Sequence, residues 1–157
     1  MKKNLGRTIL GLGAVIAVIL APALAQAGCS NASAAGHWAY TYSGTIFTPS
    51  GPLPAASVGH FKQDISGNVS GSQSRTVAGQ SASEDISGTI SVNSDCTASA
   101  TINVFVNGQL LRTATLALVY DGSGNHVRAL FQSLTLPDGT NIPVVLTIDG
   151  NRVTSRQ

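Results

Sequence analysis

Apolar and polar residues alternate along the chain from His37 onward, in short runs separated by turn-forming residues. In the first run Trp38, Tyr40 and Tyr42 occupy every second position, which places all three side chains on one face of a β-strand. An Asn-Gly pair between the fifth and sixth runs is the strongest hairpin signal. The pattern predicts eight strands, over residues 37–47, 56–64, 69–77, 85–92, 97–106, 110–120, 126–136 and 142–148.

Two other segments contain residues that commonly interrupt strands. Residues 48–54 include three prolines and a glycine, so we expect a loop there. The sequence Asp-Gly-Asn at residues 149–151 predicts a turn after the eighth strand. Residues 152–157 then either add a ninth strand or fray.

Eight strands joined by short turns leave no segment long enough for a crossover helix, which excludes parallel βαβ units. The expected fold is therefore all-β. We favour an eight-stranded antiparallel up-and-down barrel, because short links suit neighbouring strands and closure removes exposed sheet edges. A two-sheet β-sandwich is the alternative.

The two halves of this predicted barrel differ in polarity. The second, third and fourth strands are rich in Ser, Gly and Gln, which indicates one thin or solvated wall. The later strands hold most candidates for the core, namely Ile102, Val104, Leu116, Leu118, Leu130, Phe131, Val144, Leu146 and Ile148.

The N-terminal segment has the three parts of a secretory signal. A basic start precedes an uncharged apolar run over residues 9–20, and an Ala-x-Ala sequence ends at Ala27. We expect a signal peptide over residues 1–27 and a single β-barrel domain over residues 28–157, exported to the periplasm or secreted. A retained N-terminal anchor is the alternative, although the apolar run is short for a membrane-spanning helix.

Removal of this segment would change the charge of the chain. The full sequence has nine Lys and Arg residues and seven Asp and Glu residues, a formal net charge of +2. Lys2, Lys3 and Arg7 lie in the signal, so six basic residues remain against seven acidic ones, a net charge of −1. Without a basic patch we expect no nucleic-acid partner, and the serine-rich third strand argues against membrane insertion of the barrel.

Cys29 and Cys96 are the only cysteines of the chain. In an exported protein such a pair predicts one disulfide. The alternative is that Cys29, which follows a small residue, is the lipidated cysteine of a bacterial lipoprotein. Lipoprotein signals usually carry Leu three places before the cysteine, where this chain has Gln26, and lipidation would leave Cys96 as a lone thiol.

Residues that commonly carry chemistry show no catalytic or metal-binding pattern. His37, His60 and His126 fall on different predicted strands, without the short spacing of a zinc site. Glu84 and Asp85 are adjacent, and neighbours on a strand point to opposite faces, so they make a poor acid–base pair. We predict no catalytic residue, no metal site and no cofactor, and we favour a protein that is not an enzyme.

Two arginines share predicted strand faces with leucines, Arg112 on the sixth strand and Arg128 on the seventh. If these faces point inward, each guanidinium needs an acidic side chain or an anionic ligand as its partner. A β-bulge that reverses the face, or a side chain that extends to the rim, is the alternative. The aromatic row fits either a plain core or a ligand cage. The candidate ligand-binding residues are Trp38, Tyr40, His60, Arg112 and Arg128.

Three short motifs carry a resemblance to known proteins: Trp-x-Tyr at Trp38, Ser-Gly-Thr at Ser87 and Asp-Cys-Thr at Asp95. With these motifs the chain resembles a group of small uncharacterised secreted bacterial β-barrel proteins. More distantly it is similar to calycin-type barrels, which include lipocalins and allene oxide cyclases. The resemblance implies a barrel and export, and it supplies no activity.

Three functions fit these observations. The leading hypothesis is an exported barrel that binds a small apolar or amphipathic ligand, or serves as a stable envelope accessory; a lumen fully packed with side chains would contradict the ligand. The first alternative is a small enzyme of cyclase or isomerase type, which would bring at least three of Tyr40, His60, Arg112 and Arg128 around one cavity. The second is a structural or adhesive cell-surface subunit, suggested by the abundant Ser, Thr and Gly. The sequence leaves the oligomeric state open.

Overall fold

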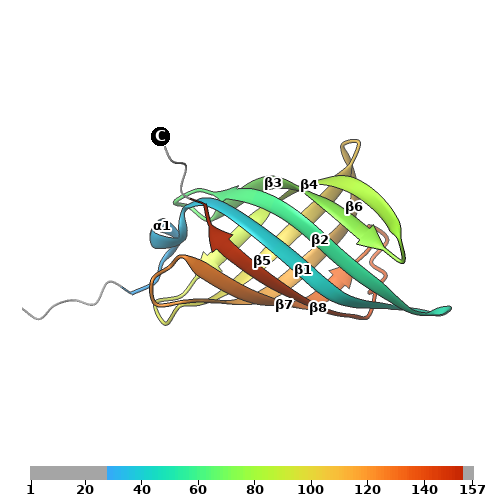
Figure 1. The fold of residues 1–157 in the computed structure, drawn as a ribbon. Helices are drawn as coiled ribbons and strands as arrows, with labels where there is room; N and C mark the ends of the chain where they lie inside the picture. The colour runs from blue at the N-terminus through green and yellow to red at the C-terminus, as the bar shows by residue number, and fades with distance from the viewer. Residues whose placement is uncertain (1–27, 154–157) are drawn as a thin grey trace, which may run out of the picture.

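The computed structural model describes residues 28–153, which form a closed β-barrel with a short helix at one end (Figure 1). The predicted signal peptide, residues 1–27, lies outside the described residues, as do residues 154–157 of the predicted tail. The elements are α1 (Asn31–Ala34), β1 (Gly36–Thr48), β2 (Gly51–Gln63), β3 (Asn68–Val77), β4 (Gln80–Val92), β5 (Thr97–Val106), β6 (Gln109–Tyr120), β7 (His126–Thr135) and β8 (Val144–Arg152).

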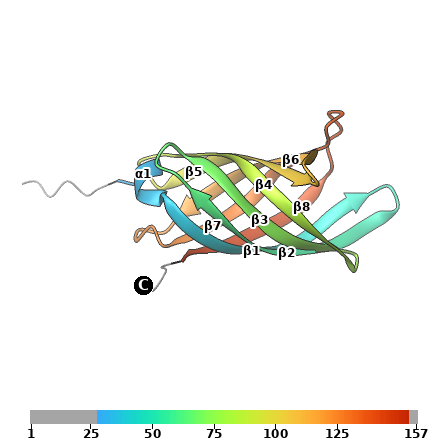
Figure 2. The ribbon, with the colours of Figure 1, turned by 90° about the horizontal axis from the view of Figure 1, so that it is seen from above.

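Each strand pairs antiparallel with the next strand along the chain, and β1 also pairs with β8. This pairing closes the sheet, so the predicted eight-stranded up-and-down barrel is confirmed and the two-sheet sandwich is wrong. The strands run obliquely around the barrel in both views (Figures 1 and 2). Among the described residues, no helix has the length and apolar character needed to cross a membrane.

The prediction of a loop over residues 48–54 is wrong, because β2 begins at Gly51 and contains two of the prolines. Pro52 and Pro54 pair with β1 in a hairpin that extends beyond the rest of the barrel (Figures 1 and 2). Pairing of β2 with β3 starts only at Ala55, so the outer edge of this hairpin has no neighbouring strand. A proline is tolerated on such an edge, because there is no neighbouring strand to which its nitrogen would have to donate a hydrogen bond.

The predicted turn at residues 149–151 is also wrong, because these residues lie within β8. Gly150 is paired with Tyr40 on one side and Val127 on the other, so neighbouring strands on both sides supply its backbone partners. A Cβ atom at this glycine would lie 2.9 Å from a methyl carbon of Val127. The residue therefore serves close packing and not chain reversal. Similarly, β4 begins at Gln80, earlier than its predicted start at residue 85.

A β-bulge in β7 decides which of its side chains enter the barrel. The pairing of β6 with β7 shifts by one residue, leaving Gln132 without an opposite partner. On one side of the bulge Phe131 and on the other Leu134 face the interior. Leu130 is 48% exposed, so its predicted place in the core is wrong, and the Arg128 side chain is 78% exposed, so it does not enter the lumen. The bulge is the alternative that the sequence left open for Arg128.

Helix α1 packs against one end of the barrel, where it is held by aromatic and cationic side chains. The indole nitrogen of Trp38 donates a hydrogen bond to the carbonyl oxygen of Ala34 at 3.0 Å. The guanidinium of Arg152 lies 5.1 Å from the centre of the Trp38 ring and donates to the carbonyl oxygens of Ser33, Ala35 and Gly124. These contacts join α1, β1, β8 and the turn between β6 and β7 at this end of the barrel.

The predicted disulfide between Cys29 and Cys96 is present, and it ties the residues before α1 to the start of β5. It closes a loop with a sequence separation of 67 residues. In the chain-entropy account such a closure contributes about 4 kcal/mol to the free energy of unfolding. The sulfur of Cys29 is used in this bond, and a thioether-linked lipid would require the same atom.

Candidate functional site

The lumen of the barrel holds a cavity of about 130 Å³. Its walls are mainly apolar, with contributions from Phe61, Ile86, Ile102, Leu116 and Phe131 among others. A buried cavity of about 150 Å³ holds a benzene-sized molecule, so this one has room for about six carbon atoms. The lumen is therefore not fully packed with side chains, which is the condition that the ligand hypothesis requires.

A cluster of polar side chains lies on the inner wall, centred on Glu84 of β4, whose side chain is fully buried. Its carboxylate accepts hydrogen bonds from Arg75 Nε at 2.8 Å and from Gln73 Nε2 at 2.7 Å. Both terminal nitrogens of Arg112 also donate to it, one to each carboxylate oxygen. Strands β3, β4 and β6 thus meet through one carboxylate.

The cluster continues to β1 and β2 through Gln73. The side-chain oxygen of Gln73 accepts hydrogen bonds from the hydroxyl of Tyr40 at 2.7 Å and from that of Ser57 at 3.2 Å. Gly59 stands opposite Tyr40 on β2, and a Cβ atom there would lie 2.8 Å from Cζ of the tyrosine ring. The missing side chain leaves room for the ring of Tyr40, whose hydroxyl bonds to Gln73.

The cluster carries an excess of positive charge. It contains the two cations Arg75 and Arg112, while Glu84 is the one acidic residue that is buried within residues 28–153. Arg75 and Arg112 line the cavity, whereas Glu84 lies behind them. Burial raises the pKa of Glu84, but hydrogen bonds and charge from Arg112, with further bonds from Arg75 and Gln73, outweigh burial and hold that pKa below its usual value. The carboxylate is therefore ionised at neutral pH, and the cluster has a net charge of +1.

The two tyrosines beside the cluster stay protonated. Burial raises the pKa of Tyr42 to about 12, although the neighbouring guanidiniums of Arg112 and Arg75 oppose this shift. Burial also raises the pKa of Tyr40, and the proximity of Tyr42 and Glu84 adds to the shift. At neutral pH both hydroxyls remain hydrogen-bond donors, so they add no negative charge to the lumen.

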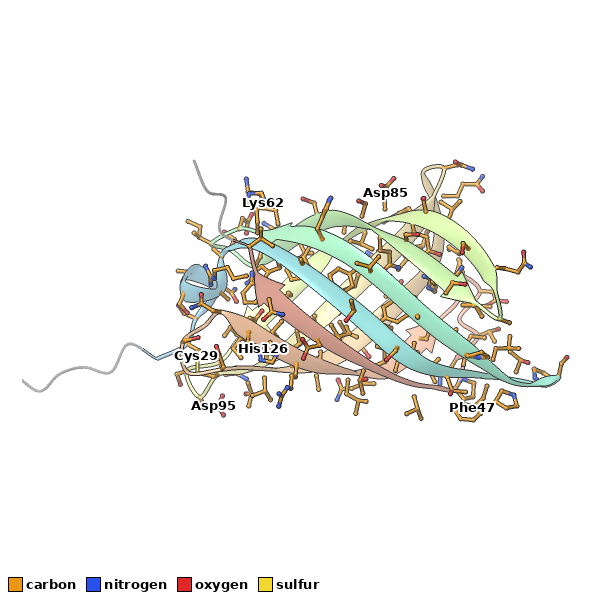
Figure 3. All side chains as sticks on the ribbon, in the orientation of Figure 1. Cys29, Phe47, Lys62, Asp85, Asp95 and His126 are labelled. Atoms are coloured by element: carbon orange, nitrogen blue, oxygen red, sulfur yellow. A yellow bond between two sulfur atoms is a disulfide. The ribbon has the colours of Figure 1, made fainter. Side chains whose placement is uncertain are left out.

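The cluster lies toward the end of the barrel opposite α1. Arg75 is close to the end of β3 and Arg112 to the start of β6, and both of those strand ends are remote from the helix. Their side chains keep 19% and 11% of their surface exposed. Figure 3 labels Cys29 at the helical end and Phe47 at the far end, in the extended β1–β2 hairpin. The charged part of the cavity wall is thus also the part that solvent reaches.

The predicted ligand-binding residues fall into three groups. Tyr40 and Arg112 line the cavity. Trp38 is buried at the helical end, where its ring is stacked at 6.2 Å from that of Phe61, and it is not part of the cavity wall. His60 and Arg128 are exposed on the outer face of the barrel. Only two of the four residues expected around an enzyme's cavity are therefore there.

Sequence reasoning missed Gln73, Arg75 and Glu84. Strand alternation held a signal for Glu84, because it shares a face with Ile86 and Ile90, which are both buried. A carboxylate on an apolar strand face requires a buried partner. Among residues 28–153, no three metal-ligating side chains lie close enough together to hold a metal ion.

Comparison with known proteins adds little to this description. No known protein family matches the chain, and neither does any curated protein. Solved structures that resemble it include a redesigned beta barrel, with 16% sequence identity and a TM-score of 0.47. That match covers 83% of this chain and 98% of the other. The resemblance to secreted bacterial barrels and to calycins stays a prediction, and what the chain is similar to is a small β-barrel.

Proposed function

We propose that this protein is exported and binds a small amphipathic molecule inside its barrel. The observation that carries the proposal is a largely apolar cavity of about 130 Å³ whose wall includes the side chains of Arg75 and Arg112. An apolar space that ends on charged groups matches a molecule with an apolar body and a polar head.

The energetics favour a ligand with an extended apolar part. Each methylene group moved from water into the cavity contributes about 0.8 kcal/mol. About six carbons inside the cavity would contribute about 5 kcal/mol, which offsets the several kcal/mol lost in translational and rotational freedom on binding, and a ten-carbon chain would leave its remaining carbons outside the cavity. The polar head would remain near the arginines, where part of the surface stays in contact with water.

Export is supported by the N-terminal sequence and by the disulfide between Cys29 and Cys96, since such bonds persist mainly in oxidising compartments. A periplasmic or secreted location remains part of this proposal, as does the division into a signal over residues 1–27 and a domain over residues 28–157.

The alternative functions have less support. An enzyme of cyclase or isomerase type would need reactive groups around the cavity, and His60 and Arg128 lie on the outer face. A structural or adhesive subunit would use free sheet edges, and within residues 28–153 closure of the barrel confines such edges to strand ends, for example residues 51–54 of β2 and residues 80–84 of β4. The cavity inside the barrel therefore favours ligand binding over the other two functions.

Native mass spectrometry of the protein expressed from its full-length sequence tests the proposal. We expect the mass of residues 28–157 with the disulfide intact, together with a retained organic molecule or the uptake of added decanol or decanoate. A bare protein that takes up neither compound would contradict ligand binding. A mass that includes residues 1–27 would contradict cleavage of the signal.

A further inference from the structure

We propose that the ligand of the lumen carries a carboxylate head group and that Arg75 binds it. This inference rests on the proposed function, because it names the chemical class of the molecule that the cavity holds. It is carried by the charge balance and the hydrogen bonding of the three ionised side chains, Arg75, Glu84 and Arg112.

The charge balance favours an anion. Two guanidiniums face one carboxylate in a part of the lumen where all three side chains are largely removed from water. An unbalanced buried charge is costly, and a counter-charge placed beside it is correspondingly favourable. A ligand with one negative charge neutralises the cluster, whereas a neutral or cationic head leaves the excess in place or increases it.

The hydrogen bonds identify Arg75 as the side chain that is free to bind. Both terminal nitrogens of Arg112 already donate to the two oxygens of Glu84. Arg75 uses only Nε for Glu84, and no residue among 28–153 accepts a hydrogen bond from its two terminal nitrogens. Guanidinium groups bind carboxylates through two parallel N–H donors, and Arg75 has such donors available at the cavity wall.

Glu84 acts as a positioning residue in this arrangement. It holds both guanidiniums against the wall through the bonds described above, and it reduces the charge of the pair from +2 to +1. A monoanionic carboxylate completes the balance, while a doubly charged phosphate monoester would leave a net negative charge in the lumen. The cluster therefore favours a carboxylate over a phosphate head.

Isothermal titration calorimetry with head groups on one chain length tests the inference. We expect decanoate to bind at least about tenfold more tightly than decanol, and decylamine and decyl phosphate to bind more weakly than decanoate. Equal affinity for decanol and decanoate would overturn the carboxylate assignment and leave the proposed function standing. Binding of none of the four compounds would overturn both.

A pair of arginine variants then tests the role of Arg75. Arg75→Gln should lower the affinity for decanoate by at least about tenfold, because the carboxylate head loses its partner. The affinity for decanol should stay within about twofold. Arg128→Gln, which removes an exposed arginine of the outer face, should change neither affinity. Unchanged decanoate binding in Arg75→Gln would overturn the assignment. If that variant does not fold, Arg75→Lys keeps the charge and loses the two-pronged geometry, and weaker decanoate binding is again required.

Discussion

Glu84 shows how a single side chain organises the interior of this barrel. Its carboxylate joins β3 and β6 to its own strand β4 through Arg75 and Arg112. The next residue, Asp85, points to the outer surface, as strand alternation requires. Two adjacent acidic residues therefore have different roles, and only the inner one affects the electrostatics of the lumen.

The first prediction concerns Glu84→Gln. The folded-state pKa of Glu84 is lowered, so its contribution to stability is present above the unfolded pKa of about 4.3 and is lost as pH falls through the folded value. Near neutral pH the variant should lose about 3 kcal/mol of unfolding free energy, because two buried guanidiniums lose their partner.

Urea unfolding at neutral pH and at roughly pH 3 measures this effect. The difference between wild type and Glu84→Gln should narrow in acid, and the neighbouring exposed variant Asp85→Asn should differ little from wild type at either pH. If the unfolding free energies of wild type and Glu84→Gln differ by the same amount at both pH values, Glu84 is not an ionised, paired side chain.

The second prediction concerns the close contact at Gly59. In Gly59→Ala the new methyl group would lie 2.8 Å from Tyr40 Cζ and 2.8 Å from the carbonyl oxygen of Ser72, so the ring must move and its bond to Gln73 is lost. We expect a loss of about 1–3 kcal/mol in unfolding free energy. The control Gly122→Ala has nothing within 4 Å of its added methyl and should be close to neutral. Equal effects of the two variants would contradict the packing described for Tyr40.

At the scale of elements, much of the fold could be predicted because neighbouring strands pair in chain order. Alternation identified all eight strands, and the Asn107-Gly108 turn is present with φ angles of 51° and 77°. Boundaries failed where pairing overrides local preference, as at Pro52 in a hairpin edge and at Gly150 between two strands. The residue types of a segment indicate its tendency to form a turn, but they do not show whether a neighbouring strand will pair with that segment.

The candidate site was less predictable for a related reason. The sequence left open whether Arg112 and Arg128 face inward, and in the structure Arg112 lines the cavity. Arg128 faces outward, because the bulge at Gln132 changes which residues of β7 share a face, and a bulge has no reliable local signal. Alternation also could not join Glu84 to Arg75 and Arg112, since the curvature of the closed barrel, and not sequence spacing, brings β6 close to β4.

The third prediction tests the bulge directly. Deleting Gln132 removes the extra residue of the bulge, so Phe131 and Leu134 stay on the inner face and continuous alternation is restored. We expect a loss of less than about 2 kcal/mol in unfolding free energy, measured by chemical denaturation. Deletion of Ala117 in β6, where the pairing with β5 is continuous, turns either Leu116 or Leu118 outward and should cost more than about 4 kcal/mol. A Gln132 deletion that costs as much as the Ala117 deletion would contradict the assignment of Gln132 as the extra residue of the bulge.

At the scale of the whole molecule, the two ends of the barrel differ in their side chains. The helical end is held by the disulfide, by Trp38 and by Arg152, while the other end carries the charged part of the cavity wall. The disulfide is therefore remote from Arg75 and Arg112. This division predicts that removing the disulfide lowers stability but changes binding in the lumen little.

The fourth prediction follows from this division. Replacing both cysteines, Cys29→Ala with Cys96→Ala, should lower the free energy of unfolding by up to about 4 kcal/mol. Decanoate affinity, measured below the melting transition, should stay within about twofold of wild type, because the bond lies at the end remote from the arginines. A large loss of affinity in a folded double variant would contradict the separation of the two ends.

The central claim is that the lumen of the barrel holds the ligand, and filling the lumen tests it most directly. Leu116 lines the cavity, whereas Val119 on the same strand is 57% exposed on the outer face. Calorimetric titration with decanoate should show a loss of more than about tenfold in affinity for Leu116→Phe and no change for Val119→Phe, with both variants folded. A folded Leu116→Phe protein that binds decanoate as tightly as wild type would place the ligand outside the barrel and contradict the account.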